Sequence, residues 1–457
     1  MVQIGLLLMF LVLGNILRRK IPLFNKCLIP SALLGGTVLL TVNVICKRFG
    51  FVMLDNRLMQ VITYHCLAIG FAAMSLKTEK HTHKIDPVQV VEFGALQGGV
   101  YMIQAIAGLA LTIVMFLFTK GGRNVISYIC GLILPLAFGQ GPGNALSWDI
   151  QFTNTPGAMF AGNGSFGLSL ASIGFVVASV LGVLYINIHK KRGTLVPREV
   201  LDTAVVETED DGEEIPDNES VDKFTLQMGF VALAYALAFG FMYLLGSLSE
   251  FTNNIAWGFN FLWASLAAMV IRFVVKKLRK GQLMHRGYIS NYQMDRISGL
   301  AFDLMIVAGV SAIEINDIKS YIIPIVLLTI VGTVVTYAYI RMVVGECFRG
   351  FEHEFFLMSF GTFTGTASNG MILMKEIDPQ LRTPVSSLYI LSNFPAMVMI
   401  APLLLLLSFA GQSLGNALIA FVIFLVLCGC YTVYLLRRRI FKKYYADKPV
   451  AVWTEEG

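Results

Sequence analysis

The chain has 457 residues, of which 56% are hydrophobic and only 14% are charged. Soluble proteins carry about 25% charged residues, so this composition excludes an ordinary soluble globular protein. The net charge of +6 does not indicate a nucleic-acid partner, because the basic residues cluster at the ends of apolar stretches. Apolar stretches of about 18 residues or more, enough to cross a bilayer, recur from Val2 to Leu436, and they indicate an all-α polytopic membrane protein.

The apolar stretches predict eleven spans and two shorter interrupted segments. The spans lie near residues 2–17, 28–45, 58–76, 90–118, 160–188, 224–247, 255–275, 297–314, 320–344, 383–408 and 414–436. The interrupted segments lie near residues 126–150 and 353–377. The basic residues predict the orientation, because cytoplasmic loops carry an excess of lysine and arginine.

An outside N-terminus and a cytoplasmic C-terminus place nearly all basic residues inside. Of the 35 Lys and Arg residues, only six then lie outside: Lys47, Arg48, Arg57, Lys120, Arg123 and Lys319. We therefore expect a multi-pass membrane protein in this orientation.

An acidic linker, residues 189–222, divides the chain into two similar halves. It contains "ETEDDGEEIPDNES" and almost no large apolar residues, which is typical of a flexible cytoplasmic connector. Each half, 1–188 and 223–409, has four spans, an interrupted segment and a fifth span, and an odd number of crossings inverts the second half relative to the first. Two inverted-topology five-helix repeats, each with a re-entrant hairpin, are therefore predicted, followed by an extra span and a basic tail in 410–457. Secondary transporters often have this architecture.

The first interrupted segment contains "AFGQGPGNALSW". Its glycines permit backbone conformations that are closed to other residues, and Pro142 removes an amide donor. At membrane depth such a break is tolerated against protein, water or a ligand. The freed amides suit a carboxylate and the freed carbonyls suit a cation, although close helix packing would also explain small residues. The predicted substrate-binding residues here are Gly139, Gln140, Gly141, Gly143 and Asn144.

The second interrupted segment contains "SFGTFTGTASNG", which repeats the same frame of Phe-Gly, three residues, Gly, one residue and Ala. Its hydroxyl and amide side chains add hydrogen-bonding groups to a second broken backbone. The predicted substrate-binding residues of this segment are Gly361, Thr362, Thr364, Gly365, Thr366, Ser368 and Asn369.

Asp303 is the carboxylate predicted to couple a cation, because an ionisable residue inside a span is costly and marks a functional site by default. A proton carrier and a structural partner of a neighbouring helix are the alternatives. Ser392 and Asn393, with Pro395, are expected to break the tenth span and to face the second hairpin. Two further carboxylates, Glu92 and Asp149, are expected to be solvated ends of spans.

Several motifs together resemble the bacterial sodium/glutamate symporter family. They are "IPSALLGGTVLL", "LAIGFAAMSL" and "FGQGPGNALSW" in the first half, and "FGTFTGTASNG" and "LSNFPAMVMIAPL" in the second. By this resemblance, Gly139, Gly141 and Gly143 match glycines of the first re-entrant loop, and Gly361 and Gly365 match two glycines of the second. The chain departs from the family at Phe363, where another glycine is usual.

The resemblance implies a homodimeric secondary transporter in the lipid of a bacterial inner (plasma) membrane that moves glutamate, or a similar small acidic amino acid, together with sodium. The alternative is the same architecture carrying another carboxylate or organic anion, or coupled to protons. An enzyme is not expected, since Asp303 has no second facing aspartate and no HExxH motif occurs. No cofactor and no metal beyond a transported Na⁺ are expected.

Overall fold

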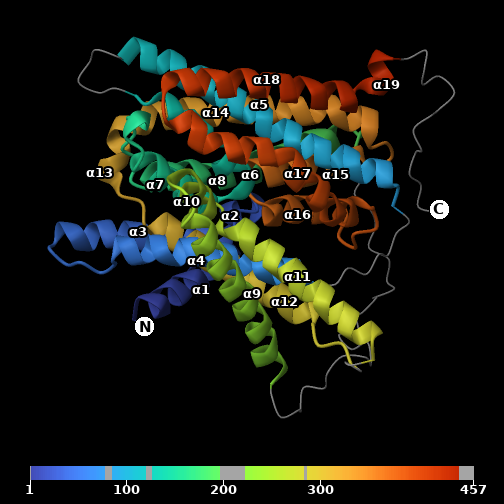
Figure 1. Ribbon diagram of the computed structural model, residues 1–457, viewed down its shortest axis with the longest axis horizontal. Coiled ribbons are helices and arrows are strands. Elements are labelled where there is room, and N and C mark those ends of the chain that lie inside the picture. Colours follow the sequence, from blue (N-terminus) through green and yellow to red (C-terminus); the bar gives the residue numbers. More distant parts are fainter. Residues whose placement is uncertain (1, 78–84, 120–125, 196–221, 283–285, 442–457) are drawn as a thin grey trace. The chain divides into compact units, whose positions relative to one another are not determined.

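The computed structural model describes residues 2–77, 85–119, 126–195, 222–282 and 286–441. In these residues every regular element is a helix, with no β-strand (Figure 1). The first half contains α1 (Val2–Lys20), α2 (Pro22–Lys26), α3 (Ser31–Arg48), α4 (Asn56–Leu76), α5 (Pro87–Thr119), η1 (Tyr128–Leu132), α6 (Ile133–Gln140), α7 (Pro142–Thr153), η2 (Pro156–Ala158) and α8 (Ser165–Lys191).

The second half is also helical throughout its described part. It contains α9 (Lys223–Gly246), α10 (Glu250–Gly258), α11 (Asn260–Lys280), α12 (Asn291–Ser311), α13 (Ile315–Ile318), η3 (Lys319–Tyr321), α14 (Ile322–Cys347), α15 (Glu352–Thr364), α16 (Ala367–Lys375), α17 (Val385–Gly411), α18 (Leu414–Leu435) and α19 (Arg437–Ile440). Most of the predicted linker, residues 196–221, and the predicted tail from residue 442 lie outside the described residues.

Nine helical stretches within the described ranges are long and apolar enough to cross a membrane. They are α1, α3, α4, α5, α8, α9, α17, α18 and the stretch Ile315–Cys347 that ends with α14. The predicted all-α class is confirmed, and the nine helices are consistent with a polytopic membrane protein.

Two of the eleven predicted spans are not among these nine helices. The span expected at 255–275 is bent by 73° between α10 and α11, at a position where Gly258 precedes Phe259. The Tyr64 hydroxyl donates to the Trp257 carbonyl at 2.7 Å, and the Asn260 amide donates to the Tyr64 carbonyl at 2.8 Å. These bonds satisfy polar groups at the bend. The other, α12, is not among the nine because it is less apolar, so its membrane crossing stays a prediction.

The prediction that the tenth span is broken is wrong. Helix α17 runs without interruption from Val385 to Gly411 and contains Pro395 and Pro402 in its interior. Proline removes one backbone donor and disfavours an interior helical position, but in a membrane helix its neighbours can satisfy the freed carbonyl.

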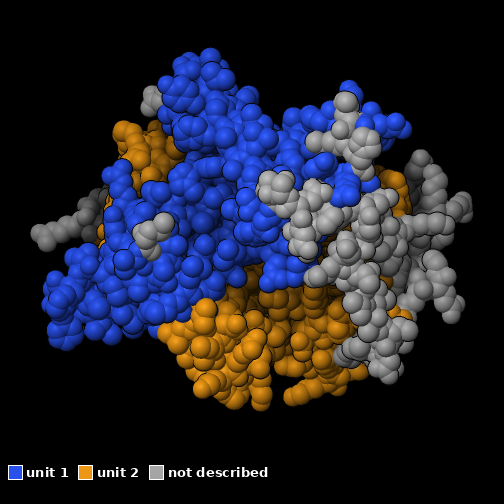
Figure 2. All heavy atoms as spheres, turned by 90° about the horizontal axis from the view of Figure 1, so that it is seen from below, with its two compact units in different colours: residues 1–11, 35–80, 201–311 blue, residues 12–34, 81–200, 312–457 orange. Residues whose placement is uncertain are grey.

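The chain forms two compact units, shown in different colours in Figure 2. Unit 1 comprises residues 1–11, 35–80 and 201–311, and unit 2 comprises residues 12–34, 81–200 and 312–457. The units therefore do not follow the two linear halves of the sequence. Each unit combines a part of the first half with a part of the second.

Unit 1 is built around α4, α9, α11 and α12, which pack against one another. Its buried core has alanines four residues apart on three of these helices: Ala68 and Ala72, Ala234 and Ala238, and Ala264 and Ala268. Residues at this spacing share one face of a helix, and small side chains let helix backbones approach closely in a membrane. This pattern explains why three such apolar helices form one tight cluster.

Unit 2 is organised by α5, which packs against α6, α14, α17 and α18. Helix α8 contacts α6, α7, α14, α15 and α16, and α6 contacts α15. Both sequence motifs with matching frames therefore belong to this one unit.

Candidate functional site

The first motif forms two helices separated by a single residue. Helix α6 ends at Gln140 and α7 begins at Pro142. Gly141 between them has φ 81° and ψ −170°, a backbone region that is essentially restricted to glycine. Proline at the first position of α7 fits, because its missing amide would have no partner inside the helix. The break is therefore encoded by the pair Gly141 and Pro142.

The beginning of α7 is buried and has no side-chain cap. The first amides of any helix lack partners within the helix and carry a partial positive charge. Asn144 in this first turn is fully buried, and neither its amide nitrogen nor its carbonyl oxygen has a hydrogen-bond partner among the described residues. An unpaired buried amide is costly, so this point has unused capacity for a polar ligand.

The second motif forms α15 and α16, with Gly365 and Thr366 between them. A Cβ built on Gly361 would lie 2.6 Å from the Cα of Gly370, so Gly361 allows the two helices to approach closely. A Cβ on Gly365 would lie 2.6 Å from the Asn369 amide nitrogen. Gly361 therefore has a packing role, whereas Gly365 makes room for a polar side chain.

The first turn of α16 repeats the pattern of α7. The N-cap residue Thr366 forms no side-chain capping bond, and the buried amide nitrogen of Asn369 has no acceptor in the described part of the chain. The other hydroxyls predicted as ligands are placed differently. Thr362 and Thr364 donate to carbonyls of their own helix at 2.7 Å and 2.6 Å, and Ser368 is exposed.

One turn of α5 connects the two broken pairs. A Cβ built on Gly139 would lie 2.6 Å from the Tyr101 ring, and the ring centroids of Tyr101 and Phe363 are 5.9 Å apart. The side-chain nitrogen of Gln104 donates to the Phe363 carbonyl at 2.8 Å and to the Thr336 hydroxyl at 2.7 Å. Tyr101 thus contacts the ends of both α6 and α15, and Gln104 contacts the end of α15.

Helix α8 also contacts both pairs. A Cβ built on Gly174 would lie 2.5 Å from the Thr364 carbonyl oxygen and 3.1 Å from the Phe138 ring. Together with α5, this contact brings the predicted substrate residues of the two motifs into one region of unit 2. Sequence reasoning missed Tyr101, Gln104 and Gly174. The signal for Tyr101 and Gln104 was a polar pair three residues apart, hence on one face of a mostly apolar helix, and Gly174 had no such signal.

The predicted cation-coupling residues lie on two further helices, α12 and α17. Asp303 lies on α12 in unit 1, where its side chain is exposed and forms no hydrogen bond or ion pair with any described residue. Ser392 is buried on α17 and accepts from Gln97 of α5 at 2.8 Å. Asn393, one residue further, is exposed.

Two carboxylates expected to be solvated are instead buried. Asp149 is fully buried, because its two oxygens accept from the Gly164 amide at 2.9 Å and the Gly167 amide at 2.7 Å at the start of α8. The amides at a helix N-terminus favour a carboxylate, which accounts for this burial.

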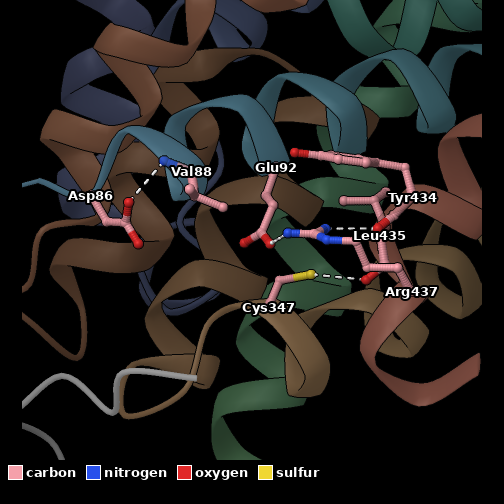
Figure 3. A network of polar contacts seen from close by, with 7 residues as sticks. All are labelled: Asp86, Val88, Glu92, Cys347, Tyr434, Leu435 and Arg437. Carbon is pink, nitrogen blue, oxygen red and sulfur yellow. Dashed lines mark hydrogen bonds and ion pairs between the residues drawn. The ribbon is translucent and has the colours of Figure 1, made fainter. Parts of the chain in front are cut away.

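Glu92 is the second correction, and Figure 3 shows its surroundings. Its side chain is 1% exposed and accepts from Arg437 at 2.5 Å. Arg437 also donates to the Tyr434 carbonyl at 2.7 Å, with its guanidinium 4.3 Å from the centre of the Tyr434 ring. The partner lies 345 residues away in sequence, so no local pattern around Glu92 indicates this pair.

The described residues define a helical protein with nine candidate membrane helices and with two broken helix pairs in unit 2. Its chemistry has two parts: amides at the beginnings of α7 and α16 suit an anion, and carbonyls at helix ends suit a cation. No family model matches the chain, and no curated protein matches it.

Proposed function

We propose that the protein is a secondary active transporter that moves glutamate, or a similar small acidic amino acid, together with sodium across a bacterial plasma membrane. The observation that supports this most is the pair of uncapped helix beginnings, α7 and α16, each with a buried asparagine in its first turn whose amide nitrogen has no acceptor among the described residues. Buried polar groups are normally hydrogen-bonded. A ligand with a carboxylate would satisfy them.

The roles of the two helix beginnings follow from their charge. The start of a helix carries about half a positive elementary charge, and two such ends favour an anionic substrate without a buried arginine. Asn144 and Asn369 would each offer amide donors. Under this proposal Gly141, Gly143 and Gly365 keep the backbone free of side chains where the substrate approaches.

The composition of the compact units supports an inverted repeat. Unit 2 takes α5 to α8 from the first half and α14 to α17 from the second, and unit 1 takes part of α1, most of α3, and α4 from the first and α9 to α12 from the second. In the proposed architecture these are pseudo-equivalent segments, and the broken pairs are re-entrant hairpins that enter from opposite sides. The proposal includes a homodimer, an outside N-terminus and a cytoplasmic C-terminus, with α18 as an extra span.

Uptake of labelled glutamate into proteoliposomes, with sodium and proton gradients imposed separately, tests the proposal. We expect accumulation driven by an inward sodium gradient and abolished when choline replaces sodium. Competition by unlabelled aspartate and by simple dicarboxylates then reports the substrate class. Accumulation of another carboxylate, or accumulation driven only by a proton gradient, would favour the alternative given by the sequence. Glutamate-independent sodium currents far above carrier turnover would contradict a transporter.

A further inference from the structure

A buried carboxylate joins α7 to the start of α8. Asp149 lies near the C-terminal end of α7 and is fully buried. One of its oxygens accepts from the Gly164 amide at 2.9 Å, and the other accepts from the Gly167 amide at 2.7 Å. The Thr153 hydroxyl lies 3.5 Å from the first oxygen and accepts from the Asn163 amide at 3.1 Å. Asp149 therefore fixes the second helix of the first broken pair to the next long helix.

The second broken pair ends in a similar construction. Asp378 follows the end of α16, is fully buried, and donates through its own amide to the Met374 carbonyl of that helix at 2.9 Å. One of its side-chain oxygens accepts from the Arg382 amide at 2.9 Å. The other accepts from the amide and the hydroxyl of Thr383 at 2.9 Å and 2.7 Å. Because Thr383 directly precedes the N-cap residue of α17, Asp378 fixes α16 to α17.

Each of the two connecting loops contains a residue other than glycine in the left-handed region. Asn163 has φ 51° in the first loop, and Leu381 has φ 52° in the second. Such a conformation is costly for a residue with a side chain, and it persists where surrounding contacts determine the backbone. The two aspartates supply such contacts, because their oxygens accept from amides on the far side of each loop.

We propose that Asp149 and Asp378 are positioning residues for the substrate, because each fixes a helix whose first turn carries a buried asparagine with an amide nitrogen that lacks an acceptor among the described residues. Asn144 lies on α7, five residues before Asp149. Asn369 lies on α16, and Asp378 follows the end of that helix. A binding group must be held within about 0.5 Å of its productive position. This inference rests on the proposed symport of an anionic substrate.

The experiment measures glutamate uptake by the reconstituted full-length protein over a range of glutamate concentrations. Asp149→Asn and Asp378→Asn keep the size of the side chain, but the new amide nitrogen cannot accept a hydrogen bond. We expect each variant to raise the glutamate concentration at half-maximal uptake about tenfold, the effect of losing one charge-assisted hydrogen bond. The maximal rate per folded molecule should stay close to the wild-type value, because the loss falls on substrate binding.

Asp55→Asn is the matched control. Asp55 is the exposed N-cap residue of α4, and its carboxylate accepts from the Arg57 amide at 2.9 Å. It makes the same kind of bond at a helix that belongs to neither broken pair. The Asp55→Asn variant should melt slightly earlier and keep the wild-type glutamate concentration at half-maximal uptake.

Hydrogen exchange of the loop amides tests the contacts themselves without any substrate. Asp149→Asn should speed exchange in peptides that cover residues 160–168, and Asp378→Asn should do so in peptides that cover residues 380–386. Each variant should leave the other loop at its wild-type rate.

Faster exchange without a change in the half-maximal glutamate concentration would make the two aspartates purely structural and overturn the positioning role. Wild-type exchange in both loops, or an equal change in uptake by Asp55→Asn, would overturn it as well. A wild type that takes up no glutamate would overturn the symport, while the exchange rates would still report whether the aspartates hold the loops. The two failures are therefore distinguishable.

Discussion

Gly141 occupies a backbone conformation that a side chain would strain. At φ 81° and ψ −170°, an alanine costs about 1 to 3 kcal/mol. We expect Gly141→Ala to lower the melting temperature and to abolish glutamate uptake, because the end of α6 and the start of α7 would shift together. Gly240→Ala in α9 is the control, since its Cβ would meet nothing within 4 Å. The Gly240→Ala variant should keep the wild-type melting temperature or raise it. Normal uptake by Gly141→Ala would show that the break does not shape the site.

Asp303 allows a second test at the residue scale. Its side chain is exposed on α12, and the sequence assigns it to cation coupling. We expect Asp303→Asn to raise the sodium concentration needed for half-maximal uptake, because the charge would compensate the lost hydration of the cation. If it carries a proton instead, the variant should retain exchange and lose accumulation driven by a pH gradient. A variant that only melts earlier, with the same sodium dependence, would assign Asp303 to helix packing.

The individual site residues were only partly predictable. The helix break at Gly141 and Pro142 is predictable from the local sequence, because the backbone conformations that glycine and proline favour are properties of these residues themselves. Glu92 and Gln104 are different, since their environments depend on Arg437 and Phe363, which lie hundreds of residues away. A residue's position near the end of a span says nothing about which helix covers it. This is why Glu92 and Asp149 were predicted wrongly as solvated.

At the scale of elements, α18 is attached to its neighbours by polar contacts as well as apolar packing. The Tyr431 hydroxyl donates to the Met399 carbonyl of α17 at 2.8 Å, and Thr432 and Tyr339 of α14 form a 3.1 Å hydrogen bond. Arg437, the first residue of α19 directly after α18, then pairs with Glu92 of α5. The extra span thus contacts the helices that surround the broken pairs.

Removal of one partner of this ion pair should be strongly destabilising. Loss of one member of a buried pair costs about 3 to 5 kcal/mol, whereas replacement of both by apolar residues is often neutral. We expect Arg437→Ala to lower the melting temperature more than the double variant Glu92→Leu, Arg437→Leu. Arg439→Ala, an exposed neighbour in the same run, is the control and should have little effect. Equal losses in the single and double variants would show that packing, not the pair, holds α18.

Helix existence could be predicted from the sequence better than helix shape. Long apolar runs set the elements, because their length matches the bilayer. The bend before Phe259 was missed, although Gly258 precedes it, because it depends on hydrogen bonds from Tyr64 and Asn260. Pro395 led to the opposite error, because a break was predicted there and α17 continues through it.

For the whole molecule, the orientation of the termini is the decisive test. A single cysteine placed beside Met1 or beside Trp453, in a variant without the seven native cysteines, can be labelled with an impermeant maleimide in intact cells. We expect labelling only near Met1, because an odd number of spans puts the ends on opposite sides. Labelling of both positions from outside would contradict the predicted span count and, with it, the inverted repeat.

The interleaving of the two units has a consequence for synthesis. Each unit needs segments from both sides of the linker. When only the first half of the chain has been synthesised, the core of neither unit is therefore complete. Multidomain chains commonly fold their N-terminal domain first, but this chain has no such domain to fold. Its early helices must wait in the bilayer, as inserted but unpartnered segments, until the later ones arrive. The same requirement means that two separately translated halves, cut within the linker, would have to find each other to make either unit.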